Sequence, residues 1–238
     1  MARPNTIELW RGESALTGDP IVALASCLAR PSRNDKTGDM IQTWILRQDM
    51  SPIRASAEDM DDAVCGDCKF RAGNGCYVAL RSPQAVWKTW KAGNVPAADH
   101  RRLQGNFARK PIRLGAYGDP AAVPLNVWIN AIIATGTLTW TGYTHAWKTC
   151  DQEFRKWVMA SVDTIQEQDA ARLAGWKCFR TVPDDTMRVP HSILCPAHTR
   201  GVTCAECGLC RGTQGSGKDI IMPIHGYQKK KALKAIAV

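Results

Sequence analysis

The sequence lacks an apolar run that is long enough to cross a membrane. A membrane-spanning helix needs about 20 mostly apolar residues, and no segment of the 238-residue chain approaches that length. The first ten residues also lack the apolar stretch of a secretory signal peptide. We therefore expect no membrane partner and a protein that stays in the cytoplasm of the cell that makes it.

Internal repeats, low-complexity segments and phosphate-binding loops are missing as well. Lys36 lacks the glycines that precede the lysine of a phosphate loop, and no Ser or Thr follows Lys218. These absences argue against a repeat protein and against a nucleoside triphosphatase of the phosphate-loop type. The oligomeric state is left open by the sequence.

The chain has few acidic residues for its number of basic ones, and its formal net charge is +9. Part of the excess lies near the C-terminus, in Lys229, Lys230, Lys231 and Lys234. Such a stretch is typical of a solvated basic surface, but it also attracts polyanions. A nucleotide or a nucleic acid is therefore a candidate partner.

Cysteine is abundant, with ten residues in the chain. A cytosolic protein of this size does not normally use so many cysteines for disulfides, and seven of them fall into two tight groups. The first group is Cys65, Cys68 and Cys76, which share one glycine-rich loop. Three thiolates can hold a 4Fe–4S cluster and leave one iron open to a substrate or cofactor.

The second group is Cys195, Cys204, Cys207 and Cys210. Its last three members have the spacing that is common in ferredoxin cluster loops, and Cys195 supplies a fourth ligand. Four thiolates saturate a second 4Fe–4S cluster, but they also satisfy a tetrahedral zinc ion. We therefore predict one or two iron–sulfur clusters, with zinc as the alternative at the second group.

Strand and helix patterns alternate along most of the chain. The strand patterns cover residues 41–46, 111–118, 137–143, 157–161, 176–182, 191–195 and 220–224, and the helix patterns cover 83–91, 124–134 and 165–173. Alternation of this kind predicts an α/β fold with parallel strands, and about six units predict a partial (β/α) barrel. We expect an N-terminal segment (1–35), the partial barrel with the first group (36–190), a C-terminal cysteine-rich metal-binding extension (191–226) and a basic tail (227–238).

Several segments together resemble the phage gene product eighty-eight family. The resemblance covers roughly residues 34–226. It rests on the two cysteine groups and on short runs beside them, namely residues 41–44, 51–52, 113–120, 142–145, 195–196, 203–210 and 225–226. That family is distantly similar to radical S-adenosylmethionine (SAM) enzymes. The resemblance implies a bacteriophage protein that acts in the host cell, with an electron donor if it is redox-active.

The similarity to radical SAM enzymes also implies where a cofactor would sit. In those enzymes a three-cysteine loop follows the first barrel strand, which residues 41–46 would form here. Gly118 and Asp119 would lie at the end of the second strand, where the SAM amino group is held. The second cysteine group would be an auxiliary cluster. The cysteine spacing departs from the usual radical SAM motif, with two and then seven residues between the cysteines.

Five further residues are candidates because they end or occupy predicted strands, where α/β sites gather. Asp119, Tyr117 and His145 are candidate catalytic residues, and Ser161 and Arg180 are candidate contacts to a cofactor or substrate. Each has a purely structural alternative. Asp119 before a proline is often a helix N-cap, and a histidine such as His145 is often a satisfied core residue.

Overall fold

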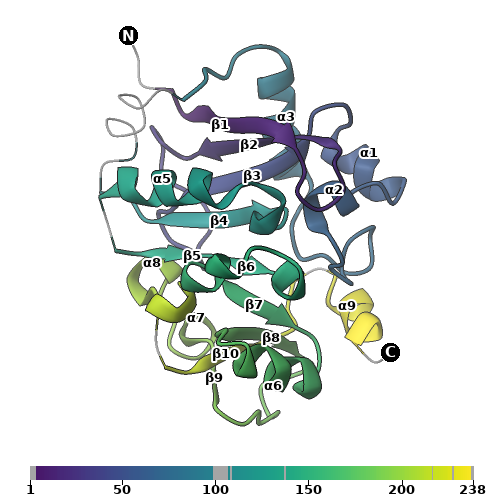
Figure 1. Ribbon diagram of the computed structural model, residues 1–238, viewed down its shortest axis with the longest axis vertical. Coiled ribbons are helices and arrows are strands. Elements are labelled where there is room, and N and C mark those ends of the chain that lie inside the picture. Colours follow the sequence, from purple (N-terminus) through teal and green to yellow (C-terminus); the bar gives the residue numbers. More distant parts are fainter. Residues whose placement is uncertain are drawn as a thin grey trace.

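The computed structural model describes residues 4–98, 107, 109–136, 138–215, 217–226 and 228–236. Within this part of the chain, no helix is long and apolar enough to cross a membrane. Figure 1 shows strands stacked from β1 at one end of the molecule to β9 at the other, with helices along them. The predicted α/β class is confirmed, with one mixed and one parallel sheet.

The first sheet has five strands in sequence order: β1 (Thr6–Glu13), β2 (Pro20–Ser26), β3 (Ile41–Arg47), β4 (Ile112–Tyr117) and β5 (Trp140–Thr141). β1, β2 and β3 pair antiparallel, and β3, β4 and β5 pair parallel. β3 is buried along its whole length, as expected for a central strand covered on both faces. The predicted N-terminal segment (1–35) contains β1 and β2, which extend this sheet.

The second sheet is wholly parallel, with the order β6 (Tyr143–Thr144), β7 (Met159–Val162), β8 (Cys178–Val182), β10 (Asp219–Pro223) and β9 (Ser192–Leu194). One hydrophobic core runs from β1 through β8, so the two sheets belong to one folding unit. The strand predicted at 137–143 is divided between β5 and β6, and its first residue, Thr137, lies outside the described residues.

Gly142 separates the two sheets. A Cβ atom at this position would lie 2.6 Å from Cγ1 of Val158 and 3.1 Å from Cβ of Leu114, so a larger residue does not fit. Its carbonyl accepts a bond from the Met159 amide, and its own amide donates to the Cys210 carbonyl. The Gly142 amide therefore bonds the loop that bears the second cysteine group instead of continuing the sheet.

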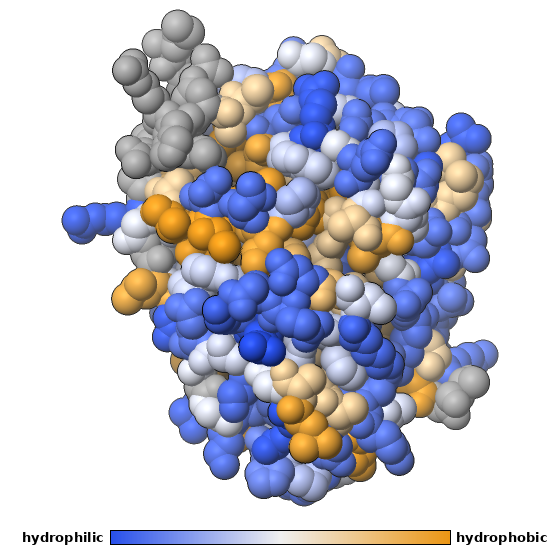
Figure 2. All heavy atoms as spheres, in the orientation of Figure 1, coloured by the Kyte–Doolittle hydropathy of each residue, from blue (hydrophilic) through white to orange (hydrophobic). Residues whose placement is uncertain are grey.

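The predicted helices are present with well-defined ends. They are α3 (Arg81–Lys91), α5 (Leu125–Thr135) and α6 (Ile165–Leu173). Two helices that were not predicted are α1 (Pro52–Ala57) and α2 (Asp62–Cys65), and the 3-10 turns are η1 (Pro120–Ala122), η2 (Ala146–Lys148) and η3 (Gln152–Lys156). Ser51 caps α1 and Thr164 caps α6 through their side-chain oxygens. Figure 2 shows hydrophobic side chains gathered over the α5 region, where Ile133 is 67% exposed.

The second cysteine group is an insertion rather than a C-terminal extension. It lies between β9 and β10, which are both strands of the parallel sheet, and contains α7 (Pro196–Thr199), α8 (Cys204–Cys207) and η4 (Gly212–Gln214). The prediction of an extension is therefore corrected. Beyond β10, the described part of the basic tail forms α9 (Lys229–Ile236), while Tyr227 and residues 237–238 lie outside the described residues.

Candidate metal centre

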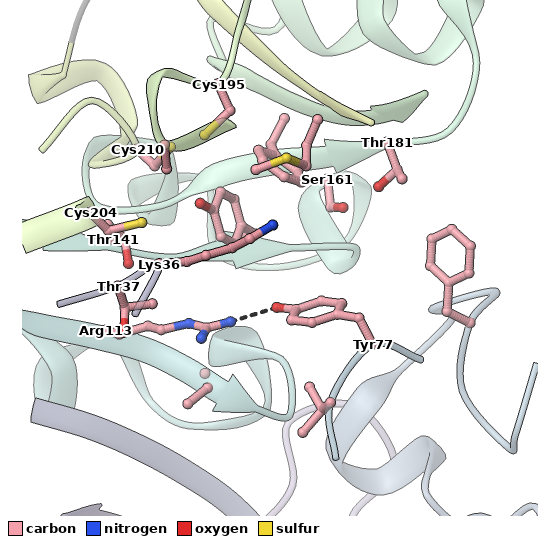
Figure 3. A pocket seen from close by; sticks show the side chains of 18 of the residues that line it. Lys36, Thr37, Tyr77, Arg113, Thr141, Ser161, Thr181, Cys195, Cys204 and Cys210 are labelled. Carbon is pink, nitrogen blue, oxygen red and sulfur yellow. Dashed lines mark hydrogen bonds between the residues drawn. The ribbon is translucent and has the colours of Figure 1, made fainter. Parts of the chain in front are cut away.

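One cavity of about 400 Å³ brings together all seven cysteines of the two groups. The first group reaches it from the loop after α2, and the second group reaches it from the insertion between β9 and β10. Strand residues complete the wall, and Figure 3 shows several of them with three of the cysteines. All ten cysteines are free thiols, so neither group is tied up as disulfides.

The first group is shaped by tight turns and by the C-terminal helix. Cys65 ends α2, and Gly66 follows it with a φ of 54°, which turns the chain toward Cys68. Cys76 is held from outside, because its carbonyl accepts a 3.0 Å hydrogen bond from Nε2 of Gln228. The helix α9 therefore packs on the cysteine loop, which the sequence did not indicate.

The second group is held by the segment that precedes β3. The amide of Cys204 donates to the Lys36 carbonyl at 3.0 Å, and the amide of Ala205 donates to the Thr37 carbonyl at 3.0 Å. Thr203 caps the short helix α8 in a capping box with Glu206. Cys210 is fixed from the other side by the backbone bond from Gly142. Two distant segments thus place this loop over the sheet.

Burial in the cavity raises the pKa of five of the cysteine thiols. It raises the pKa of Cys76 and of Cys204 to about 11 each, and it also raises the pKa of Cys65, Cys195 and Cys210. The desolvated thiolate is disfavoured in these places, so these five thiols are protonated at neutral pH unless a cation is bound. A metal centre would supply the positive charge and release the protons.

Among the residues that the structure describes, no set of three or more His, Cys, Asp or Glu side chains is arranged to hold a metal ion as it stands. A zinc ion with Zn–S bonds of about 2.3 Å draws its sulfurs to about 3.8 Å from one another. The ligands of an iron–sulfur cluster stand further apart, because irons and sulfides lie between them. In its chemical type, a set of thiol donors around a cavity fits an iron–sulfur cluster.

Asp119 lines the cavity, but both of its carboxylate oxygens are occupied. Oδ1 accepts a 2.9 Å bond from the Ala121 amide, which makes Asp119 the N-cap of η1, and Oδ2 accepts a 2.7 Å bond from the His145 amide. Burial raises the pKa of Asp119, although these bonds oppose the shift. The structural alternative for this residue, an N-cap, is therefore present in the molecule.

His145 and Tyr117 lie beside the first cysteine group. Burial lowers the pKa of His145, but the Cys68 sulfur and the Asp119 carboxylate outweigh burial and raise it to about 9. The Tyr117 hydroxyl is buried and has no hydrogen-bond partner in the described part of the chain. Burial and the adjacent Cys65 raise its pKa. Both residues line the cavity.

The remaining predicted residues divide into two sets. Gly118 and Ser161 line the cavity, and Gly118 packs so closely that a Cβ there would lie 2.7 Å from Cβ of Ile45. Arg180 does not line the cavity. It alternates along β8 with Phe179 and Thr181, which do, so its side chain belongs to the opposite face. The structure does not bring Arg180 to the predicted cofactor site.

The cavity is also lined by residues that were not among the predicted site residues. Arg113 of β4, Tyr77, Tyr143 of β6 and Lys36 all line it. The signal for Arg113 and Tyr143 was the alternation along their strands, because they share a face with Tyr117 and His145 respectively. Lys36 had no signal of this kind, since its position depends on a contact with the distant residue Cys204.

Comparisons with protein-family models, with curated proteins and with solved structures gave no match for this chain. Its function therefore has to be inferred from its own geometry.

Proposed function

We propose that this protein is an iron–sulfur enzyme, of bacteriophage origin and of radical SAM-like architecture, that acts in the cytoplasm of the host cell. The observation that supports it is the convergence of seven cysteines from distant segments on one cavity. Seven unpaired thiols around a space of about 400 Å³ are a donor set that suits iron–sulfur centres, and the space is large enough for a small substrate.

The strand arrangement supports the partial-barrel part of the proposal. The strands β3, β4, β5 with β6, β7, β8 and β10 are parallel and follow one another in sequence order, apart from the break at Gly142. In a (β/α) barrel, functional groups gather at the carboxyl ends of such strands. The first cysteine group comes after β3, as the resemblance to radical SAM enzymes implies.

The cysteines would then have two roles. Cys65, Cys68 and Cys76 would hold a 4Fe–4S cluster with one open iron, and the other four would hold a second cluster, with zinc as the alternative. Bound clusters would supply electron transfer and a Lewis-acidic iron for a ligand. Asp119 would act as a positioning residue, because it fixes the backbone of His145. Gly118 and Ser161 would contact SAM if it binds.

The positive net charge of +9 supports a nucleotide or a nucleic acid as the substrate class. A redox-active centre in this cavity would also need an external electron donor. These partners follow from charge and from the resemblance, and the cavity wall contains polar and cationic residues as well.

Elemental analysis of anaerobically prepared protein tests the proposal. Three variants are compared with the wild type: Cys65→Ala/Cys68→Ala/Cys76→Ala, Cys204→Ala/Cys207→Ala/Cys210→Ala, and the control Cys27→Ala/Cys150→Ala, whose cysteines do not line the cavity. We expect brown wild-type and control proteins with equal iron content, and each triple variant to lose the iron of its own group. Iron-free wild-type protein would refute the proposal.

A second candidate function is a non-catalytic zinc protein that binds nucleic acid or a host protein. The observation that favours it is the exposure of four lysines along α9, Lys229, Lys230, Lys231 and Lys234. Colourless protein with stoichiometric zinc would support this candidate. Brown protein whose visible absorption bleaches on reduction would exclude it.

A further inference from the structure

Arg113 is a buried cation whose backbone is firmly placed. It lies near the start of β4, pairs in register with Gln42 of β3 and Thr141 of β5, and is 8% exposed. Its carbonyl accepts a 3.0 Å bond from Oγ1 of Thr43. The position of the guanidinium is therefore set by the centre of the sheet, and the side chain faces the cavity (Figure 3).

The guanidinium of Arg113 has no carboxylate partner in the described part of the chain. Its Nη2 donates a hydrogen bond to the Tyr77 hydroxyl at 2.5 Å. Two other arginines do have carboxylate partners: Arg47 is buried and bonds Asp19 and Asp49 at 3.0 Å each, and Arg71 bonds Asp61 at 3.0 Å. A buried charge normally requires such a partner. Arg180 also has buried nitrogens without a hydrogen-bond partner in the described part of the chain, but only Arg113 of these two arginines lines the cavity.

A second cation reaches the same cavity from another segment. Lys36 lines the wall, and Figure 3 shows its side chain directed into the space above Arg113. Its backbone carbonyl is fixed by the amide of Cys204. The hydroxyl-bearing residues Thr37 and Thr141 lie in the same part of the wall. Two cations and two hydroxyl groups thus surround one end of the cavity.

Other residues of the wall are apolar or aromatic. The rings of Tyr143 and Phe179 pack against each other with their centroids 4.3 Å apart, and Met222 and Ile224 extend this surface. A ligand that fits both parts has an anionic group at one end and an apolar body at the other. An arginine fork is well matched to a carboxylate or a phosphate group.

We propose that Arg113 and Lys36 form an anion subsite that binds the carboxylate or phosphate of a small, otherwise apolar ligand between the two cysteine groups. The subsite deepens the proposed function, because it names the ligand class of the same cavity, and as a substrate site it rests on that function. Binding of the anion itself needs only the described side chains. It can therefore be measured separately from metal content.

The test uses thermal unfolding and calorimetric binding on the anaerobically purified full chain. The probes are benzoate, phenyl phosphate, inorganic phosphate and, as a neutral analogue of benzoate, benzamide. We expect benzoate or phenyl phosphate, but not benzamide, to bind and to raise the unfolding temperature. Stronger binding of one of the two anions assigns the subsite to carboxylates or to phosphates, and inorganic phosphate shows whether the apolar body contributes.

The variant Arg113→Gln should weaken anion binding by about tenfold or more, because a charge-assisted hydrogen-bonded pair is lost. It should also raise the unfolding temperature of the ligand-free protein, because a buried unpaired charge is removed. A merely structural arginine would show the reverse, with a lower unfolding temperature and unchanged anion binding. The control is Arg188→Gln, an exposed arginine outside the cavity.

Metal content separates the two proposals. Arg113-dependent anion binding in a protein that contains no iron would support the subsite and refute the iron–sulfur function. Iron-containing wild-type protein that binds none of the anions, together with iron loss in Arg113→Gln, would overturn the subsite. In that case the Arg113 guanidinium stabilises the thiolate of Cys204, with which it interacts electrostatically.

Discussion

Gly75 and Ala232 lie so close together that a Cβ atom on Gly75 would stand 2.5 Å from the amide nitrogen of Ala232. This contact joins the loop of the first cysteine group to the helix α9. The bond from Gln228 to the Cys76 carbonyl reinforces it. The helix α9 therefore packs against one side of the cysteine loop, and its lysines are exposed.

Replacing Gly75 by alanine should displace α9. The methyl group would meet backbone atoms, and the φ of 110° is unfavourable for a residue with a Cβ. We expect the free energy of unfolding to fall by about 2–4 kcal/mol, combining a steric clash with backbone strain. Urea unfolding measures the loss.

The matched control for this prediction is Gly73→Ala. Gly73 lies in the same loop with a φ of 76°, but no atom stands within 4 Å of the point where its Cβ would lie. It should lose only about 1 kcal/mol, from backbone strain alone. Equal losses in the two variants would mean that the contact with Ala232 contributes nothing to stability.

The raised thiol pKa values predict that the metal-free protein becomes less stable toward unfolding at alkaline pH. Cys76 and Cys204 have pKa values of about 11 in the fold, against an ordinary value of 9.0. Between these values the unfolded chain has lost the thiol protons while the folded chain still holds them. Stability is then fully present below pH 9 and falls as the pH rises toward 11, by about 1.4 kcal/mol per pH unit for each thiol.

Urea unfolding of chelator-treated protein at pH 8, 9 and 10 measures this loss. The control is Cys76→Ala/Cys204→Ala, which lacks the two titrating groups and should show a shallower decline. A wild-type slope no steeper than that of the double variant would show that these thiols are not desolvated.

Much of the fold can be predicted because its elements are local in origin. The helix predicted at 165–173 has the observed ends, since Thr164 and Gly175 mark them in the sequence. The parallel strands are recognisable from short β-branched runs between helices. The grouping of Cys204, Cys207 and Cys210 follows from their spacing alone, as one short helix and the loop after it bear all three.

The rest depends on contacts between distant residues, which spacing does not reveal. β2 shows only an apolar run in the sequence, because its strand character comes from pairing with β1 and β3. The position of Arg113 in the cavity depends on the register of β4 against its neighbours. The second cysteine group is recognisable as an insertion only from the pairing of β9 with β10.

Gly142 provides a test of the junction between the two sheets. In Gly142→Ala the methyl group would collide with Val158 and Leu114, both buried. We expect a loss of about 1–3 kcal/mol in the free energy of unfolding, as for other overpacked core sites. Because the Gly142 amide holds the Cys210 carbonyl, metal bound at the second group should be lost more readily than metal bound at the first.

The measurement is urea unfolding together with metal analysis after brief exposure to a chelator. Gly217→Ala is the control, since no atom lies within 4 Å of a Cβ there and its backbone is not left-handed. Faster metal loss in both variants would indicate a general effect of the substitutions, and unchanged stability in Gly142→Ala would contradict tight packing at this junction.

Asp119→Asn separates a positioning role from a catalytic one. The amide oxygen of asparagine can keep the bond from Ala121, but its NH₂ group would face the His145 amide, which also donates. One buried donor is left without a partner, at a cost of about 1–3 kcal/mol in stability.

Asp151 is a matched control, because it caps η3 through the same bond, from the Glu153 amide at 2.9 Å, and is exposed. Since asparagine caps as well as aspartate does, Asp151→Asn should be near neutral. If Asp119→Asn were equally neutral in urea unfolding, the bond to His145 would not hold the strand end in place. The carboxylate would then be free to act on a ligand.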